Sequence, residues 1–161
     1  MVVVSDTSPI INLAMIGQLD LLPILFRQII IPQAVFDEIV TSGAALPGAK
    51  EIQEAGWIEV RTPKDQSLIE SLLAELDPGE SEAIALALEI GAGLLLMDEY
   101  LGRNAARNRN ILPLGILGIL LKAKEQGLLP AVQPLMDALI REAGFYIHTQ
   151  LYQDVLEMAW E

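Results

Sequence analysis

Four acidic residues lie where a charged side chain is costly to bury. Asp6 ends the β-branched run VVVS, and Asp98 ends the run LLLM. On a helical period, Glu38 falls on the apolar stripe of PQAVFDEIVTSG, and Glu80 falls on the stripe of PGESEAIALALEIG. An unpaired charge in such a place is strongly disfavoured, so each of the four needs an explanation.

Carboxylates that are packed together without cations repel one another and take up protons. Their oxygens suit hard divalent ions such as Mg²⁺ or Mn²⁺. In an open parallel sheet, ligands bind beyond the carboxyl ends of the strands, so two strands that end in Asp6 and Asp98 would bring both acids to that edge. We therefore predict a divalent-cation site built from Asp6, Glu38, Glu80 and Asp98.

Each acid also has a structural alternative. Asp6 and Asp98 could cap the helices that follow them. Glu80 could be the capping-box partner of Asp77, and that role does not exclude metal binding. Glu82 points away from the stripe unless the first turn of its helix is irregular.

The composition restricts the chemistry further. The chain has no cysteine and a single histidine, His148, which excludes thiol catalysis, thiolate zinc sites and paired-histidine sites. Net charge is −12, which disfavours nucleic-acid binding in general. However, residues 103–124 contain five of the ten basic residues and no acid, so this stretch could hold a phosphodiester backbone or simply form a solvated helix face. Arg103 is the strongest candidate, because it follows Asp98 by little more than one helical turn.

Short β-branched or aliphatic runs alternate with helical segments, which predicts βα units around a parallel sheet. The 161 residues predict one domain over 1–161, with a C-terminal helical extension from about 130 to 161. The aromatic residues of that extension and His148 are interpreted as structural, and the apolar run LPLGILGILL as a core helix or a self-association face.

Strands are expected at 2–5, 28–31, 58–61, 94–97 and 111–112. Helices are expected to begin near residues 8, 19, 32, 49, 66, 78, 99, 114, 132 and 148, with helix stops at Gly43, Gly91, Gly127 and Gly144.

The segments VVVSDTSPIINL, PQAVFDEIV and LDPGESEAIALALEIGAGLLLMDE, with the GR that follows, resemble the PIN domain. The likeness is to its small prokaryotic branch related to VapC-type toxins and runs in order from residue 2 to about 109. The tail AVQPLMDALIREAGFYIHTQLY resembles that branch as well. The resemblance implies a three-layer α/β/α, Rossmann-like fold with a mostly parallel, four- to five-stranded sheet. It also implies a nuclease that cuts RNA or DNA with Mg²⁺ or Mn²⁺ held by acidic residues.

Carried over by motif, the acids of the family fall on Asp6, Glu38, Glu80 and Asp98, with Glu82 and Glu99 as secondary metal ligands. Thr7 or Ser8 would supply the hydroxyl after the first acid, and Arg103 and Arg107 would contact substrate. The chain departs from the family pattern in two places: Glu80 replaces the usual Asp, and Leu101 stands where an acid or Asn is common.

The function implied by the resemblance is a metal-dependent endoribonuclease, the toxin of a toxin–antitoxin pair. Its partners would be RNA or another single-stranded nucleic acid, a small antitoxin and a second copy of the chain. A cytoplasmic location and no membrane contact are expected. One alternative is a catalytically weak PIN-like module that binds RNA or protein. Another is a Mg²⁺-dependent phosphatase or phosphotransfer domain, although a dehalogenase-like motif would need Asp where Ser8 stands.

Overall fold

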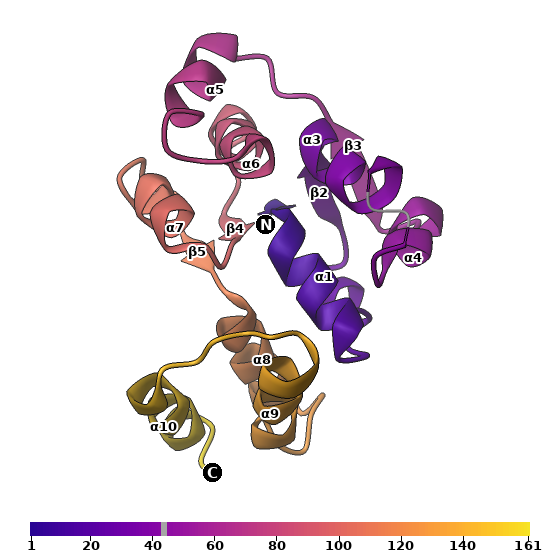
Figure 1. Ribbon diagram of the computed structural model, residues 1–161, viewed down its shortest axis with the longest axis vertical. Coiled ribbons are helices and arrows are strands. Elements are labelled where there is room, and N and C mark those ends of the chain that lie inside the picture. Colours follow the sequence, from indigo (N-terminus) through magenta and orange to yellow (C-terminus); the bar gives the residue numbers. More distant parts are fainter. Residues whose placement is uncertain (43–44) are drawn as a thin grey trace.

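The computed structural model describes residues 1–42 and 45–161, so the helix stop predicted at Gly43 lies outside the described residues. Among these described residues, five strands form one parallel sheet in the order β3-β2-β1-β4-β5. Figure 1 labels β2, β3, β4 and β5 among the surrounding helices. The strands are β1 (Val3–Ser5), β2 (Ile29–Pro32), β3 (Ile58–Arg61), β4 (Leu94–Leu96) and β5 (Pro113–Leu114).

Helices connect and cover the strands. They are α1 (Thr7–Met15), α2 (Leu21–Phe26), α3 (Gln33–Phe36), the π-helical turn η1 (Asp37–Thr41), α4 (Ala49–Glu54), α5 (Gln66–Leu72), α6 (Pro78–Glu89), α7 (Tyr100–Arg107), α8 (Ile116–Glu125), α9 (Gln133–Glu142) and α10 (Thr149–Met158). Predicted helix starts agree with these within two residues, which is the ordinary uncertainty of helix ends.

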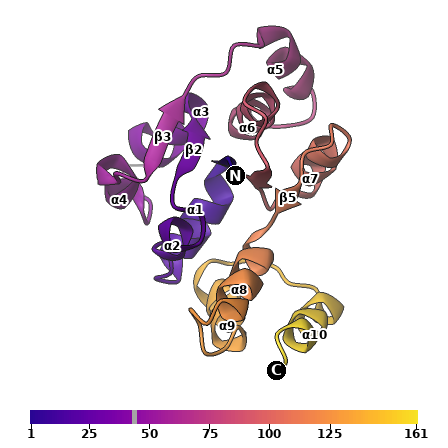
Figure 2. The same cartoon turned by 180° about the vertical axis from the view of Figure 1, so that it is seen from behind.

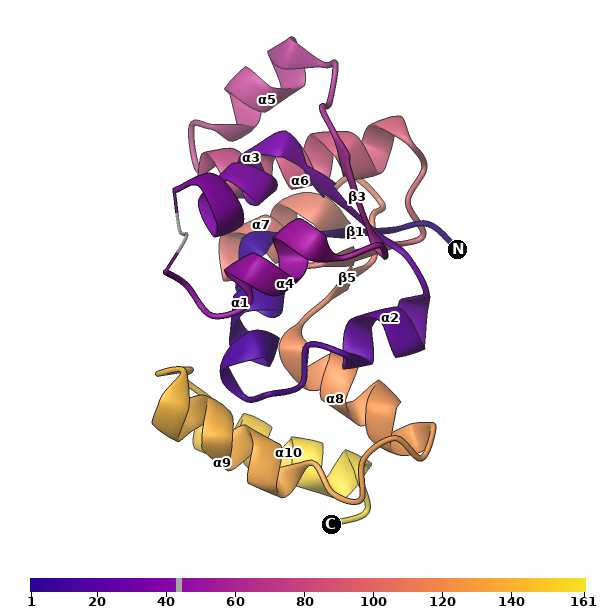
Figure 3. The same cartoon turned by 90° about the vertical axis from the view of Figure 1, so that its right-hand side faces the viewer.

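Alternate residues of the central strands point to opposite faces of the sheet, and both faces are covered. Val3 and Leu96 belong to one apolar cluster, whereas Val4 and Leu95 belong to the other. This explains why the strands read as continuous apolar runs. Figure 2 shows α7 from the reverse side, and Figure 3 shows α5 and α6 on one side of the sheet with α1, α2 and α8 on the other. The predicted three-layer α/β/α class is confirmed.

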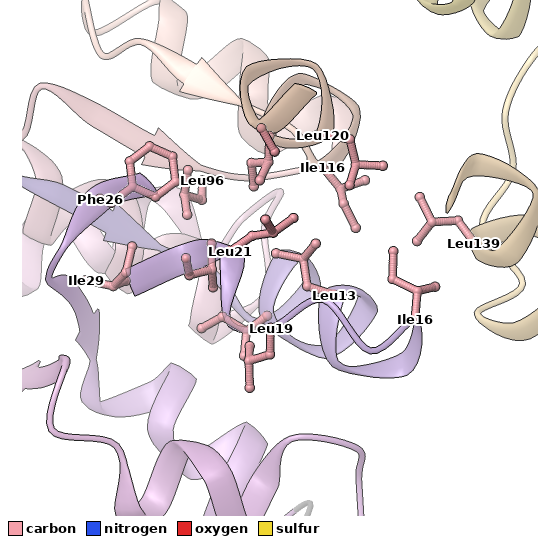
Figure 4. Packing of buried hydrophobic residues seen from close by; sticks show 14 of the residues in the cluster. Leu13, Ile16, Leu19, Leu21, Phe26, Ile29, Leu96, Ile116, Leu120 and Leu139 are labelled. Atoms are coloured by element: carbon pink, nitrogen blue, oxygen red, sulfur yellow. The ribbon is translucent and has the colours of Figure 1, made fainter. Parts of the chain in front are cut away.

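The larger core joins the C-terminal helices to the sheet layer. Leu13 of α1, Ile116 and Leu120 of α8, and Leu139 of α9 are all fully buried in one cluster, as Figure 4 shows. The apolar run LPLGILGILL is therefore mainly a core helix. Among the described residues, no helix is long and apolar enough to cross a membrane.

The last strand lies two residues later than predicted. The Leu95 N–H donates to the Leu112 carbonyl at 2.9 Å, and the Met97 N–H donates to the Leu114 carbonyl at 3.0 Å. Pro113 has no N–H to donate, and an edge strand tolerates this.

The structural interpretation of the C-terminal aromatic residues is only partly correct. Phe145 and Tyr152 pack against the large cluster, and the His148 ring accepts a hydrogen bond from the Gln150 N–H at the start of α10. Tyr146 and Trp160 are 83% and 95% exposed, so the interpretation is wrong for these two. Sequence pattern missed this because both residues follow helix ends, where helical period no longer applies.

Candidate metal-binding site

The sheet register brings Asp6 and Asp98 to the same edge. Ser5 pairs with Leu96, and the Asp6 N–H continues this ladder by donating to the Leu96 carbonyl at 2.9 Å. Asp6 therefore lies one residue beyond the last pair and Asp98 lies two residues beyond it. Asp6 is only 4% exposed, and its side chain makes no capping hydrogen bond to α1. The capping alternative is therefore wrong for Asp6.

Glu38 reaches this edge from η1. Its Oε2 accepts a hydrogen bond from the Thr7 hydroxyl at 2.5 Å, and its Oε1 accepts one from the Gly79 N–H at 3.1 Å. A Cβ on residue 79 would lie 2.5 Å from Glu38 Oε1, so only glycine allows this approach. The sequence predicts a regular helix here, but the chain widens into a π turn, a feature that is common at functional sites.

Glu80 is both a capping residue and a buried member of the site. The Glu80 N–H donates to Asp77 Oδ1 at 2.7 Å, and the Asp77 N–H donates to Glu80 Oε1 at 3.0 Å. This is the predicted capping box. The Glu80 residue is 6% exposed, so the cap holds its carboxylate in the interior.

Asp98 has one satisfied oxygen and one orphaned oxygen. Oδ1 accepts a hydrogen bond from the Ile116 N–H at 2.8 Å, so Asp98 caps α8 and not the helix that directly follows it. Oδ2 is buried and has no hydrogen-bond partner among the described residues. Nearby, Arg103 Nη1 donates to the Met97 carbonyl at 3.0 Å. Gly115 leaves room for both side chains, because a Cβ there would lie 2.9 Å from Arg103 Nη1 and from Asp98 Oδ1.

Burial raises the pKa of all four carboxyls. For Asp6 the pKa lies well above its usual value, because desolvation and the charges of Asp77, Glu80 and Glu38 outweigh the nearby Thr7 N–H. Desolvation also raises the pKa of Glu38, against the hydrogen bond from Thr7. The pKa of Glu80 rises to about 7, mainly through desolvation.

The pKa of Asp98 rises to about 6, because desolvation outweighs the Ile116 N–H and the positive charge of Arg103. The negative charge of Glu99 raises the pKa of both Asp98 and Glu80. The charges therefore couple Asp6 to Glu38 and Glu80, and Asp98 to Glu99.

The side chains at this edge offer the kind of ligand atom that a hard divalent cation prefers. All the donors are oxygens, they repel one another when ionised, and Asp98 Oδ2 is buried without a partner. The donors are only partly assembled, however. Both Glu38 oxygens accept hydrogen bonds, and no group of three or more acidic or histidine side chains in residues 1–42 and 45–161 is arranged as a metal-binding cluster. A cation would therefore require side-chain movements.

The secondary candidates lie around this centre. Glu82 Oε1 accepts a hydrogen bond from the Ala34 N–H at 3.1 Å, so Glu82 anchors the start of α3. Glu99 is exposed at the start of α7, and Ser8 is half-buried in the first turn of α1. Glu82 and Glu99 as metal ligands, and Thr7 and Ser8 as substrate contacts, stay predictions.

The basic stretch divides between two places. Arg103 is half-buried beside Asp98, and Arg107 is exposed one turn further along α7. Lys124 instead pairs with Glu161 at 2.9 Å and also donates to the Ala159 carbonyl, at the far end of α8. The phosphate-binding hypothesis for residues 103–124 therefore no longer includes Lys124, and Arg103 and Arg107 stay its candidates.

Sequence reasoning missed two residues that shape the site. It assigned Asp77 only to capping, yet its charge raises the pKa of Asp6, Glu38 and Glu80. It gave no role to Gly79. The segment DPGE held a usable signal, since a capping box places Asp77 against Glu80 and the glycine stands between them.

A family model described as a PIN domain matches residues 2–161. The chain therefore belongs to the PIN-domain family, whose members are generally nucleases and typically use divalent metals. No curated protein and no solved structure matches the chain.

Proposed function

We propose that this protein is an endoribonuclease that hydrolyses phosphodiester bonds with Mg²⁺ or Mn²⁺. The observation that carries the proposal is the buried Asp98 Oδ2, which has no hydrogen-bond partner among the described residues. It lies at the same sheet edge as Asp6, which is buried and makes no capping hydrogen bond to α1. A buried carboxylate oxygen without a donor is destabilising, so its presence needs a compensating role. Family membership makes nuclease chemistry the natural role and gives no support to a phosphatase or phosphotransfer domain.

In this proposal Asp6 and Asp98 bind the cation, and Glu38 and Glu80 complete or orient the site. When bound, the cation would polarise phosphate oxygens and lower the pKa of a water molecule. Thr7 and Gly79 hold the Glu38 carboxylate in place. Arg103, fixed by the Met97 carbonyl, lies where it can attract a phosphate towards Asp98.

The test compares Asp6→Asn and Asp98→Asn with wild type for cleavage of total RNA in Mg²⁺, in Mn²⁺ and in EDTA. Asp37→Asn is a matched control, because Asp37 is adjacent to Glu38 but accepts its hydrogen bonds from Gln33 and Thr41. We expect new 5′-phosphate ends from wild type and Asp37→Asn with metal only, and at least about a hundredfold less from the two site variants. Equal cleavage by all four proteins would refute the assigned site.

We extend the proposal to a toxin role, with a small antitoxin and a second copy of the chain as partners. We also propose a cytoplasmic location, which the absence of cysteine suits. Expression of wild type should then arrest growth, and expression of Asp98→Asn should not. Light scattering of the purified chain measures its oligomeric state. Growth that is equally unaffected by both proteins would contradict the toxin role.

A second candidate is a PIN-like module that binds RNA or protein without cutting it. It is favoured by the hydrogen bonds that occupy both Glu38 oxygens and one Glu80 oxygen. The same cleavage experiment separates the two, because a binding module would give no new 5′-phosphate ends.

A further inference from the structure

A groove of about 450 Å³ runs between the α5–α6 connection and α7. This is within the size range of sites that hold small molecules or single chemical groups of larger ones. One wall includes Ser71 and Leu76, and the other is the α7 face that carries Leu101, Asn104 and Asn108. Figure 1 shows the α5–α6 connection next to α7.

One end of the groove adjoins the carboxylate site on both walls. Leu76 directly precedes Asp77, whose carboxylate caps α6 through the Glu80 N–H. Leu101 lies two residues after Glu99, the N-cap residue of α7. A chain held in the groove would therefore meet the site at the sheet edge.

The walls combine an apolar surface with amide groups and one guanidinium. Leu101 is half exposed and offers an apolar contact, whereas Leu76 is buried. Asn104 and Asn108 lie one turn apart on α7 and can donate and accept hydrogen bonds. Arg109 Nη1 donates to the Ala105 carbonyl at 3.1 Å, which holds the guanidinium at the far end of the groove. A nucleobase has an apolar face and polar edges, so the apolar and amide side chains of the groove match its chemistry.

We propose that this groove holds an unpaired nucleobase of a single-stranded RNA whose neighbouring phosphate lies at the carboxylate site. The inference rests on the proposed function and adds where a base of the substrate is held. A base can enter such a groove only when it is unstacked and unpaired, as in single strands and loops. The charges orient the strand: Glu75 on the α5–α6 wall repels phosphates, whereas Arg107 and Arg109 follow α7.

The experiment measures binding without cleavage. A labelled single-stranded RNA of about six nucleotides is titrated in EDTA by fluorescence anisotropy against wild type, Asn108→Ala and Ser71→Glu. Ser67→Glu is the matched control for Ser71→Glu, because both serines are exposed on α5 and only Ser71 lines the groove. Gln126→Ala controls for Asn108→Ala, because Gln126 ends α8 as Asn108 ends α7.

We expect Asn108→Ala and Ser71→Glu to weaken binding by about fivefold or more, with both controls close to wild type. A duplex of the same sequence should bind more weakly than the single strand. Equal binding by groove variants and controls, or preference for the duplex, would overturn the inference. If wild type cuts RNA with metal but the groove variants bind RNA as tightly as wild type, the nuclease proposal stands and the groove inference is wrong. If the groove variants bind RNA more weakly but wild type does not cut it, the groove inference stands and the nuclease proposal is wrong. If a protein and no RNA binds at these residues, the inference is wrong.

Discussion

At the scale of single residues, Glu38 can approach the start of α6 only because residue 79 has no side chain. The substitution Gly79→Ala would place a Cβ 2.5 Å from Glu38 Oε1. Helix propensity alone favours alanine over glycine by about 1 kcal/mol, so any loss must come from the displaced carboxylate. We expect Gly79→Ala to cut RNA at least about tenfold more slowly while its free energy of unfolding changes by less than about 1 kcal/mol.

A second glycine provides the control for this prediction. A Cβ on Gly56 would have no atom within 4 Å, so Gly56→Ala should change neither cleavage nor stability appreciably. Initial cleavage rates and urea denaturation of both variants give the comparison. If Gly79→Ala cuts as fast as Gly56→Ala, the contact with Glu38 has no role in positioning.

The sequence pattern could predict which carboxylates are buried and the local contact of Glu80 with Asp77, but not the long-range contacts of Glu38. Asp6 and Glu80 were found because each interrupts an apolar pattern, and burial of both is confirmed. The partners of Glu38 are Thr7 and Gly79, which are distant from it in the chain. Local patterns carry no information on such long-range contacts.

At the scale of elements, Glu82 ties α6 to the start of the short helix α3. Its Oε1 accepts the Ala34 N–H, one of the donors that a helix start leaves unpaired. Glu82→Gln keeps an acceptor oxygen and should retain cleavage, whereas Glu80→Gln should lower cleavage. Glu82→Ala should lose about 1 kcal/mol of unfolding free energy, because the Ala34 N–H is left without this partner. Cleavage assays and urea denaturation test these outcomes, and a Glu82→Gln variant as inactive as Glu80→Gln would make Glu82 a metal ligand.

The interior of α6 contains a polar atom that serves no visible purpose. Ser81 is fully buried, and its hydroxyl has no hydrogen-bond partner in the part of the chain that the structure describes. Ser81→Ala should raise the free energy of unfolding by about 0.5–1 kcal/mol, because alanine has the better helix propensity and no unmet hydrogen bond. Thermal and urea denaturation measure this against the exposed Ser67→Ala on α5. A less stable Ser81→Ala protein would show that the hydroxyl has a partner.

Elements with strong local signals were predicted well, and those set by tertiary contacts were not. The first turn of α6 begins at Pro78 as predicted, because Asp77 and Pro78 are local start signals. The widened turn η1 was not predicted, because its extra residue follows from contacts of Glu38 outside the helix. The shift of β5 to Pro113 likewise depends on pairing with β4.

At the scale of the whole molecule, the candidate site opposes folding when it is ionised and has no cation. The chain already carries a net charge of −12, and Glu80 and Asp98 have pKa values of about 7 and about 6. The folded protein therefore holds protons on these groups at pH values where the unfolded chain has released them. Stability must fall as pH rises through this range, because the folded state then binds more protons than the unfolded state.

We therefore expect the metal-free protein to be less stable at pH 8 than at pH 5, with Asp98 alone contributing on the order of 1 kcal/mol. This window lies above the range in which Glu161 loses its stabilising charge. Burial is the largest single influence on the pKa of Glu161 and raises it, but the hydrogen bonds from the Val132 and Gln133 N–H groups and from Lys124 together lower the pKa below 4.5. Asp98→Asn keeps an acceptor for the Ile116 N–H and removes the charge, so at pH 8 in EDTA it should be more stable than wild type.

Mg²⁺ or Mn²⁺ should raise the melting temperature of wild type at pH 8, since a cation that binds only the folded state stabilises it. The same ions should raise the melting temperature of Asp98→Asn much less. Thermal denaturation at both pH values, with and without metal, gives all of these comparisons. A wild-type protein that is equally stable at both pH values and unaffected by metal would mean that these carboxylates do not form a cation site.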